Sequence, residues 1–556
     1  MNDKKELLVI KEWLLKIKEI FVKFVFIIEF LIIGIFMTSF YKFITTKAYE
    51  GYYSKVYLII CGITGGLALG IIIYAILKDK YKIEKIFLAI AIPIGMAYLI
   101  FLIPTYAPDE NAHIYRSYEI SEGILFTKTN EKNLIKSNIP SFFVENNHKT
   151  LNKYNKLNEE VKKDTNYENK VEVDNPAYSY FPTLYFPNTI MFLIGRIFNI
   201  NGIIVLYLAR IVNFIIFLIC GYYAIKIMPF GKILLMTYLL IPMSVHQAIS
   251  LSADSITNST ILLFIAYTLN LYYKEKINKK NKILYIALAA LVSVQKIVYF
   301  PIVLISIILI KVKEMTKNEK IKFIITTIVA GLVVGVLWIL LEPKGEATED
   351  IYAIQNNINS VEQIKFILTH PISYIKVLCN TIDVNIENYY LWFMGFSLGW
   401  MDIGVKRIWL DIYFIMLLFS PFLEKNDKEL KIGDKLVFIG TFLIIFVLTL
   451  TALYVGHSGV GTDIVKGIQG RYFMPVVILL LLCMCGKERY IKLKNVNSIG
   501  NISIYLTLNT PCKNIFKKPN IKFKVIMVLV FLSKFSSIVT VIFLYFNTKQ
   551  NIKTIK

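Results

Sequence analysis

The stretch VYLIICGITGGLALGIIIYAIL at residues 56–77 contains no charged side chain, and LVFIGTFLIIFVLTLTALYV at 436–455 is of the same kind. As an α-helix, either run is long enough to cross the hydrocarbon core of a bilayer, which is about 30 Å thick. A chain segment inside that core must satisfy its own backbone hydrogen bonds, so such runs cross it as helices. These stretches predict an all-α, multi-pass integral membrane protein.

The composition of the whole chain supports this prediction. Of the 556 residues, 56% are hydrophobic and 18% are charged, whereas soluble domains average about 45–50% and about 25%. The formal net charge is +23, which in a soluble protein would suggest nucleic-acid binding. Here the basic residues gather in short segments between apolar runs, as the positive-inside rule describes, so no nucleic-acid partner is expected. The six cysteines have neither metal-site nor disulfide-framework spacing and are expected to be packing residues.

The basic segments mark the cytoplasmic side of the membrane and place the N-terminus there. The apolar runs between them predict about thirteen transmembrane helices. The expected spans are 21–40, 56–77, 85–103, 203–224, 231–248, 255–273, 283–295, 297–310, 321–341, 408–423, 435–455, 472–486 and 523–546.

This count divides the chain into alternating membrane and aqueous regions. Two long segments are expected on the outer side of the membrane, and the short stretch 184–198 is expected to lie in the interface, because the parity of crossings leaves no room for it as a span. The Lys-, Asn- and Glu-rich stretch 127–174 is expected to be poorly ordered. The regions are a cytoplasmic terminus 1–20, three spans in 21–103, an outer loop 104–202, a bundle 203–341, an outer aromatic-rich segment 342–407, spans in 408–486, a cytoplasmic basic segment 487–522 and a last span 523–546.

A cluster of charged residues begins the first outer loop, in the sequence PDENAHIYR at 108–116. Pro108 ends the preceding span, Asp109 suits a helix N-cap and Gly123 suits a left-handed stop, so residues 110–122 are predicted to form a short helix.

Four charged or titratable side chains then fall close together on that helix. Asp109, His113 and Arg116 would share one face, with Glu110 at its edge. Such a group suits removal of a proton from a sugar hydroxyl, or the binding of a divalent cation against a phosphate. A helix stabilised by its own salt bridges is the alternative interpretation.

Two further clusters are expected at the outer ends of spans. Tyr178, Tyr180 and Tyr185 lie in an aromatic and proline-rich stretch that suits the membrane interface. Gln469, Arg471 and Tyr472 follow Gly467 and flank Gly470, and a guanidinium there could clamp a phosphate; a snorkelling arginine at a helix end is the alternative.

Isolated charges within or beside the apolar runs complete the set of candidates. Arg210, Asp254 and Lys296 are of this kind, and ionisable groups at membrane depth tend to be paired or functional. No phosphate-binding glycine loop, dinucleotide fingerprint or hydrolase motif occurs in the sequence, so an activated donor would have to arrive within the membrane.

In this order, the clusters over roughly residues 100–485 resemble the bacterial membrane-protein family called domain of unknown function 2142. That family is in turn similar to the GT-C superfamily, whose members take a sugar from a polyprenyl-phosphate carrier. The resemblance implies that the catalytic acid of the first outer loop is Asp109 or Glu110, and that Arg471, Arg210 and Lys296 grip the carrier phosphate. One departure is that the acidic loop here follows the third span, whereas in the superfamily it usually follows the first.

The resemblance leads to a GT-C-type glycosyltransferase that uses a polyprenyl-phosphate-linked sugar and a glycan acceptor on the outer face, for cell-envelope glycopolymer synthesis or modification. Asp109 is expected to be the general base, Glu110 its support or, with Asp109, a ligand of Mg²⁺ or Mn²⁺, and His113 an orienting group. A flippase of lipid-linked saccharide and a non-catalytic membrane scaffold remain alternatives. The residues expected to bind substrate or lipid phosphate are Arg116, Tyr178, Tyr180, Tyr185, Arg210, Asp254, Lys296, Gln469, Arg471 and Tyr472.

Overall fold

The computed structural model describes most of the chain between residues 82 and 487. The predicted span 523–546, the terminal segment 1–20, nearly all of the spans 21–40 and 56–77 and nearly all of the basic segment 487–522 lie outside the described residues. The chain divides into two compact units, Met1–Leu102 and Ile103–Lys556. The residues described are 31–35, 82–127, 135–147, 149–150, 154–342, 356–424 and 426–487, together with positions 59, 63, 66 and 70.

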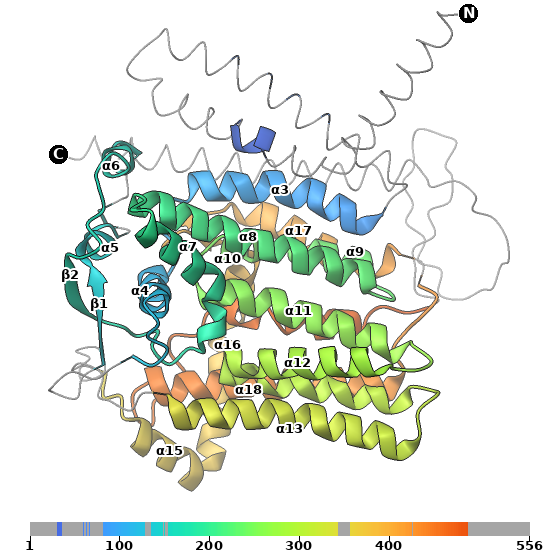
Figure 1. Ribbon diagram of the computed structural model, residues 1–556. Coiled ribbons are helices and arrows are strands. Elements are labelled where there is room, and N and C mark those ends of the chain that lie inside the picture. Colours follow the sequence, from blue (N-terminus) through green and yellow to red (C-terminus); the bar gives the residue numbers. More distant parts are fainter. Residues whose placement is uncertain are drawn as a thin grey trace, which may run out of the picture. The chain divides into compact units, whose positions relative to one another are not determined.

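The described part is mostly helical, and some of its helices are long and apolar enough to cross a membrane (Figure 1). A bent pair, α10 (Pro242–Ala248) and α11 (Ala253–Tyr272), is a further candidate, with an angle of 116° at its break. The chain is therefore a helical membrane protein with four or five candidate spans in its described part. The four single helices are α3 (Ile83–Phe101), α8 (Gly202–Ile227), α13 (Lys317–Leu341) and α18 (Ile432–His457), close to predicted positions.

Several other predicted spans are shorter or broken. The prediction of one helix over 231–248 is wrong, because α9 (Lys232–Leu239) ends before Pro242, which disfavours helical geometry in the residue before it and begins α10. The predicted span 472–486 is also wrong, since the chain there forms the 3₁₀ turn η4 (Gly470–Phe473) and the short helix α19 (Val477–Leu482). The remaining apolar elements are α12 (Lys279–Gln295), the 3₁₀ helix η2 (Ile297–Lys311), α17 (Arg407–Phe419) and the turn η3 (Ser420–Phe422).

Polar side chains fix where the long helices begin. Thr316 and Glu319 form a capping box at the start of α13, each bonding the backbone N–H of the other. Asn201 accepts hydrogen bonds from the first turn of α8, and Asn278 does so for α12. From these starts α8, α11, α12, α13 and α18 run side by side, with η2 packed against α12, α13 and α18 (Figure 1).

A polar layer covers one end of this bundle. It contains α4 (Glu110–Ser121), α5 (Ser141–Glu145), α6 (Tyr154–Glu160), η1 (Pro182–Leu184), α7 (Phe186–Ile197) and the antiparallel pair β1 (Lys136–Pro140) and β2 (Lys170–Asp174). The expectation that 127–174 is poorly ordered is wrong for its described residues, and the fold is not purely α-helical. Outside the helices this polar stretch pairs its own backbone, and it buries Ile139 and Phe143 beneath α4 and α7.

The second long segment lies at the same end. Its described part contains α15 (Ser360–Thr369), α16 (Pro371–Met394) and a small antiparallel hairpin of β3 (Ser397–Leu398) and β4 (Ile403–Gly404). Gly395 ends α16 with φ +94°, and a Cβ there would lie 2.9 Å from the backbone nitrogen of Met243. Glycine therefore allows the hairpin to fold back onto α10.

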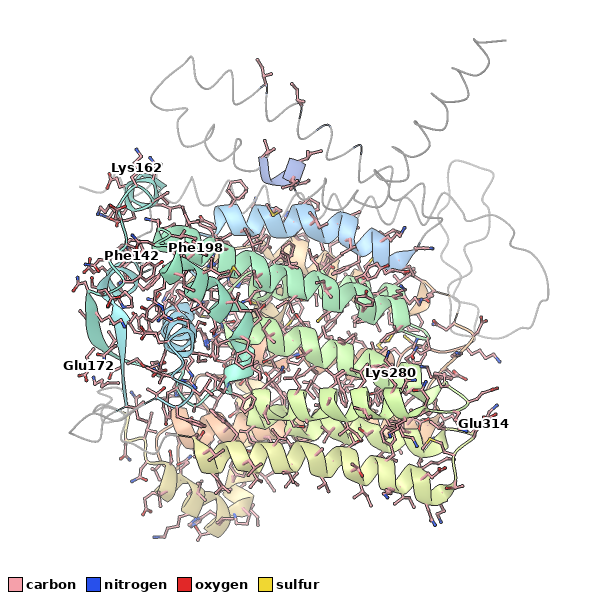
Figure 2. All side chains as sticks on the ribbon, viewed as in Figure 1. Phe142, Lys162, Glu172, Phe198, Lys280 and Glu314 are labelled. Atoms are coloured by element: carbon pink, nitrogen blue, oxygen red, sulfur yellow. The ribbon has the colours of Figure 1, made fainter. Side chains whose placement is uncertain are left out.

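The opposite end of the bundle carries lysine-rich turns. Figure 2 shows Lys280 and Glu314 at that end, and Lys162 and Glu172 near the polar layer. Lys311 reaches Asp434 at the start of α18 there, with an Nζ–Oδ1 distance of 2.6 Å. The described lysine-rich turns thus lie at the end of the bundle away from α4, so the two ends carry different kinds of side chain.

Candidate functional site

The helix α4 begins where the sequence predicted and ends within one residue of the predicted position. Gly123 has φ +84° and donates its backbone N–H to the carbonyl of Ile120, as a left-handed helix stop does. Asp109 occupies the N-cap position but has φ +61° and makes no side-chain capping bond. Its side chain is 67% exposed and forms an ion pair outside α4.

That partner is Arg471, whose Nη2 lies 3.4 Å from Asp109 Oδ2. The arginine side chain is only 8% exposed, its guanidinium lies 5.4 Å from the ring centroid of Tyr472, and its buried Nε has no hydrogen-bond partner in the described part of the chain. The preceding Gly470 is essential to this position, because a Cβ there would lie 1.9 Å from the carbonyl oxygen of Tyr389. Only glycine lets η4 approach α16 so closely.

Glu110, the next residue after Asp109, points into the protein. Its carboxylate receives two hydrogen bonds from Arg210, at 2.8 Å from Nε and 2.6 Å from Nη2, and both side chains are buried. It also accepts the backbone N–H groups of Leu251 and Ala107. This pair therefore joins the start of α4 to α8 and to the link between α10 and α11.

Arg116 also belongs to a buried network. It is fully buried and donates hydrogen bonds to Glu119 at 2.9 Å, to Thr127 and to the carbonyl of Leu125. Burial raises the pKa of Glu119, although hydrogen bonds from Thr127, Arg116 and Ser137 oppose the rise. The network holds the chain that follows α4 against that helix.

His113 lies on α4 one turn after Asp109 and faces an aromatic group. Its Nδ1 is 2.7 Å from the hydroxyl of Tyr185, and its ring centroid is 5.5 Å from that of Tyr180. Burial, followed by the positive charge of Lys296, lowers the pKa of His113 to about 3. The imidazole is therefore neutral at neutral pH. Burial likewise raises the pKa of Tyr185, so its phenol stays protonated.

Asp254 and Lys296 form a second ion pair near His113. Asp254 lies in the first turn of α11, and Lys296 lies in the extended link between α12 and η2. Gln247 donates a hydrogen bond of 3.0 Å to the free oxygen of Asp254, and the ammonium group of Lys296 lies 5.3 Å from the ring centroid of Tyr180. The predicted pair thus comes together beside the aromatic group.

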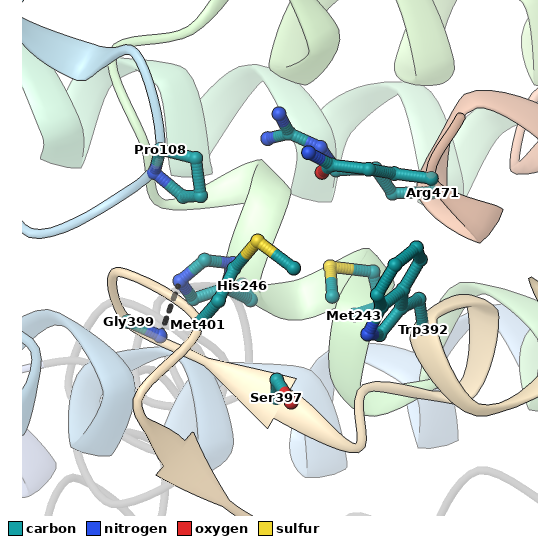
Figure 3. A pocket seen from close by; sticks show the side chains of 9 residues that line it. Pro108, Met243, His246, Trp392, Ser397, Gly399, Met401 and Arg471 are labelled. Carbon is teal, nitrogen blue, oxygen red and sulfur yellow. Dashed lines mark hydrogen bonds between the residues drawn. The ribbon is translucent and has the colours of Figure 1, made fainter. Parts of the chain in front are cut away.

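A small pocket that opens to solvent is lined by Arg471 (Figure 3), and its cavity of about 10 Å³ has room for about one water molecule. Pro108, Met243, Trp392 and Met401 form its apolar walls, so residues of both long segments line one pocket.

The polar lining of the pocket comes from three different segments. It consists of His246, Ser397, Gln469 and Arg471, together with the backbone at Gly399. His246 Nε2 accepts a hydrogen bond of 3.3 Å from the N–H of Gly399, which ties α10 to the β3–β4 hairpin.

The structure therefore divides the predicted residues into two sets. Glu110, Arg116 and Arg210 belong to buried ion pairs. Since Glu110 and Arg116 turn to partners other than those of Asp109, the prediction that they gather with Asp109 on one face of α4 is wrong. Tyr178 lies before this group, and its backbone N–H bonds the carbonyl of Asn175. Those brought together near the pocket or around His113 are Asp109, His113, Tyr180, Tyr185, Asp254, Lys296, Gln469, Arg471 and Tyr472.

Three residues outside the predicted site also shape this region. Of these, His246 was not singled out at all, whereas Trp338 and Trp392 were expected only as aromatic residues of the outer segment. His246 and Trp392 line the pocket, and Trp338 donates its indole N–H to the carbonyl of Ser179 at 2.8 Å, which holds the tyrosine-rich stretch in place. A polar His-Gln pair within an otherwise apolar run was the available signal for His246. The exposed Cys379 on α16 is also not the packing residue that was expected.

A divalent-cation site made by Asp109 and Glu110 does not fit this geometry. The oxygens of Glu110 are bonded to Arg210, Leu251 and Ala107, and the two carboxylates point to different partners. Within the described ranges, no group of three or more His, Cys, Asp and Glu side chains could hold a metal ion.

Comparison with known proteins gives one match. The sequence profile of the family described as "Predicted membrane protein (DUF2142)" matches residues 92–480, a range that contains all of the residues discussed in this site. No curated protein and no solved structure matches the chain.

Proposed function

The chain belongs to the DUF2142 family of predicted membrane proteins, and from this premise we propose that it is a GT-C-type glycosyltransferase that works on the outer face of a bacterial plasma membrane. Its donor is a sugar linked to polyprenyl phosphate, and its acceptor is a hydroxyl of a cell-envelope glycan. In this proposal the N-terminus is cytoplasmic and the chain crosses the membrane several times.

One observation carries the proposal, namely the contact of the exposed Asp109 carboxylate with the buried Arg471 guanidinium. A general base must be reachable by its substrate, and Asp109 is the exposed carboxylate of the motif, whereas Glu110 is buried. A phosphate-binding cation must have donors available, and Arg471 has a buried Nε without a partner in the described residues. The base and the phosphate site are then adjacent.

The reaction would proceed as a displacement at the anomeric carbon of the donor. The acceptor hydroxyl oxygen bonds to that carbon, and its proton passes to the Asp109 carboxylate. The bond from the anomeric carbon to the carrier phosphate oxygen breaks, and its electron pair goes to the phosphate. Arg471 stabilises the charge that develops there, and Lys296 supplies a second positive charge nearby.

The separation of 3.4 Å between Asp109 and Arg471 is long for a charged hydrogen bond, since such bonds are usually about 2.7–2.9 Å. A donor phosphate could therefore replace Asp109 at the guanidinium and leave the carboxylate free to accept a proton. His113 stays neutral and acts as a positioning residue, because it holds the Tyr185 hydroxyl beside Tyr180.

The sidedness of the molecule supports an outer active site. The lysine-rich turns at 274–282 and 311–322 lie at the end of the bundle opposite to α4 (Figure 2). Since basic loops favour the cytoplasmic side, α4 would face outward. No nucleotide supply exists there, which favours a lipid-linked donor.

The test is a transfer assay in nanodiscs with radiolabelled polyprenyl-phosphate hexoses and isolated envelope glycan. We expect labelled product from the wild type and a loss of about 10²–10⁴-fold in rate for Asp109→Asn, the usual contribution of a general base. Asp164→Asn, an exposed carboxylate remote in sequence, is the matched control and should keep the wild-type rate.

Equal rates for Asp109→Asn and wild type would rule out the catalytic role. In liposomes, movement of the labelled lipid across the bilayer without product would instead select the flippase. If the assays detect neither product nor movement of the lipid, the non-catalytic scaffold is the interpretation that remains.

A further inference from the structure

We propose that the starts of α12 and α13, with the turns that lead into them, form a lysine-rich surface that binds anionic phospholipids. The lipid phosphates lie at the lysines, and the acyl chains lie along the exposed apolar sides of the two helices. This surface is at the end of the bundle away from α4, where Figure 2 shows Lys280 and Glu314, and its lipid binding does not depend on the proposed reaction.

The charge of this surface is strongly one-sided. Residues 274–282 and 313–322 contain nine lysines and three glutamates, which leaves a formal charge of +6. Among the described residues none of these lysines forms a salt bridge, whereas Lys311, just before the second segment, pairs with Asp434 at 2.6 Å. Anionic lipids attract such clusters beside a membrane helix, and the attraction corresponds to a factor of roughly five in affinity per lysine.

The two segments form one continuous surface. The backbone N–H of Glu314 donates a hydrogen bond of 2.8 Å to the carbonyl of Glu275, which joins the two turns. Lys276 and Lys282 of the first segment also interact electrostatically with Glu319 of the second. From these turns α12 and α13 run side by side (Figure 1). The lysines of both segments are therefore held next to each other.

The lysines occupy positions that a helix by itself disfavours. Lys279, Lys280 and Lys282 lie at the start of α12, and Lys317 and Lys320 lie at the start of α13. The N-terminus of a helix carries partial positive charge, so cations there are unfavourable. The first turn of α12 contains no acidic residue that would balance them. A negatively charged partner would offset this repulsion.

Apolar side chains next to the lysines favour a lipid over a soluble polyanion. Leu284 follows Lys280 by one turn of α12 and is 54% exposed, and Ile321 follows Lys317 by one turn of α13 and is 38% exposed. Residues four apart lie on the same side of a helix. Because a phospholipid carries acyl chains next to its phosphate, one lipid can contact both kinds of side chain. A soluble polyanion would leave the apolar ones in water.

The continuation of α13 places the lysines at the level of lipid headgroups. Ile325, Val329 and Val333 are exposed along this helix, which is long and apolar enough to cross a membrane. Its exposed side therefore faces acyl chains. The lysines of its first turns then lie where the hydrocarbon ends and the phosphates begin.

The experiment titrates the full-length protein in a nonionic detergent with tail-labelled dioleoylphosphatidylglycerol, which is anionic, and with equally labelled dioleoylphosphatidylcholine, which is zwitterionic. Fluorescence polarisation gives the two dissociation constants. At about 0.1 M salt we expect the wild type to bind the anionic lipid about tenfold more tightly or better. At about 1 M salt the Debye length falls from about 10 Å to about 3 Å, so the preference should largely disappear.

The test variant combines Lys280→Gln, Lys317→Gln and Lys322→Gln. It should lose most of the preference for the anionic lipid and keep binding of the zwitterionic lipid within about twofold of wild type. Each single variant should lower the affinity ratio about fivefold, which keeps the test available if the triple variant does not fold.

The matched control removes three exposed lysines from the two long segments, in the combination Lys162→Gln, Lys376→Gln and Lys406→Gln. It loses the same number of charges and should keep the wild-type preference. Thermal unfolding in nanodiscs gives a second measurement. Anionic lipid should raise the melting temperature of the wild type and of the control more than that of the test variant.

Equal affinity of the two lipids for the wild type, or a preference that the test variant retains in full, would overturn the proposal. Binding of single-stranded RNA or of a polyglutamate peptide that the test variant loses, without any lipid preference in the wild type, would identify a soluble polyanion as the partner and would also overturn it.

Discussion

Asp109 and Arg471 lie 362 positions apart in the sequence, yet their side chains are 3.4 Å apart. Their contact joins the start of the first long segment to the turn before the last described helix. The matched family range, 92–480, includes both residues. This contact marks the candidate site. It differs from the neighbouring ion pairs because one of its two side chains is exposed.

The adjacent carboxylates Asp109 and Glu110 should differ in how much the loss of their charge destabilises the protein. Asp109→Asn alters an exposed side chain without a capping bond, so its effect on the free energy of unfolding should be within about 0.5 kcal/mol. Glu110→Gln leaves Arg210 buried without its charged partner and should cost about 3–5 kcal/mol. Thermal unfolding and yield of the purified variants measure the difference, and similar losses for both would contradict the assignment of Glu110 as structural.

The buried His113 should make stability depend on acidity. Its pKa is about 3 in the folded protein and 6.5 in the unfolded chain, so the unfolded chain binds more protons between these values. The contribution of this group is fully present above about pH 6.5 and is lost as the pH falls toward 3. The melting temperature of the wild type should therefore fall more between pH 7 and pH 5 than that of His113→Gln. Parallel pH profiles of the two proteins would refute a neutral, buried imidazole.

Gly470 should not tolerate a methyl group. In Gly470→Ala the new Cβ would lie 1.9 Å from one backbone atom and 2.6 Å from another, so η4 would have to move away from α16 and take Arg471 with it. We expect loss of donor binding together with a lower melting temperature. The control is Gly440→Ala within α18, where no atom lies within 4 Å, and it should stabilise the helix by about 0.5–1 kcal/mol.

Asp254 and Lys296 should behave as a coupled pair. Asp254→Asn and Lys296→Met each remove one charge and leave the other partly buried, whereas the double variant removes both. We expect the double variant to be more stable than the sum of the single effects by about 0.5–3 kcal/mol. A double-mutant cycle on thermal unfolding measures this coupling, and additive effects would show that the two groups are independently solvated.

The sequence predicted the helix α4 well because its limits depend on local chemistry. Pro108 precedes it, Gly123 ends it with a positive φ, and neither position depends on distant residues. The long apolar helices were predictable for the same reason, since length and composition determine whether a segment can cross a bilayer.

The partners of the charged residues could not be predicted from spacing. Helical periodicity placed Asp109, His113 and Arg116 on one face, but the left-handed backbone at Asp109 turns its side chain away, and Arg116 pairs with Glu119, its neighbour on the next turn. The pairing of Glu110 with Arg210 depends on how α4 packs against α8. Long-range packing of this kind leaves no periodic trace in the sequence.

Breaks inside apolar runs were also missed. The run 231–248 is mostly apolar, yet Pro242 divides it and α10 turns sharply into α11. That break brings His246 to the pocket. The residue was not predicted to be there, because the apolar residues around it led to the whole run being interpreted as one membrane span. The polar stretch around β1 and β2 was missed because low hydrophobicity alone suggested disorder, whereas a few apolar residues such as Phe143 are buried.

The positive φ of Asp109 restricts which amino acids can occupy that position. A left-handed backbone costs roughly 1–2 kcal/mol for most residue types and is visited readily by Gly and, among the others, by Asn and Asp. Glycine and asparagine fit the backbone but cannot accept a proton at neutral pH, and glutamate carries the acid on a side chain that does not favour this conformation. Two independent requirements therefore meet at one position, and aspartate satisfies both. Mutational tolerance there should be narrower than exposure alone would suggest, with Asp109→Glu as disruptive to activity as loss of the carboxylate.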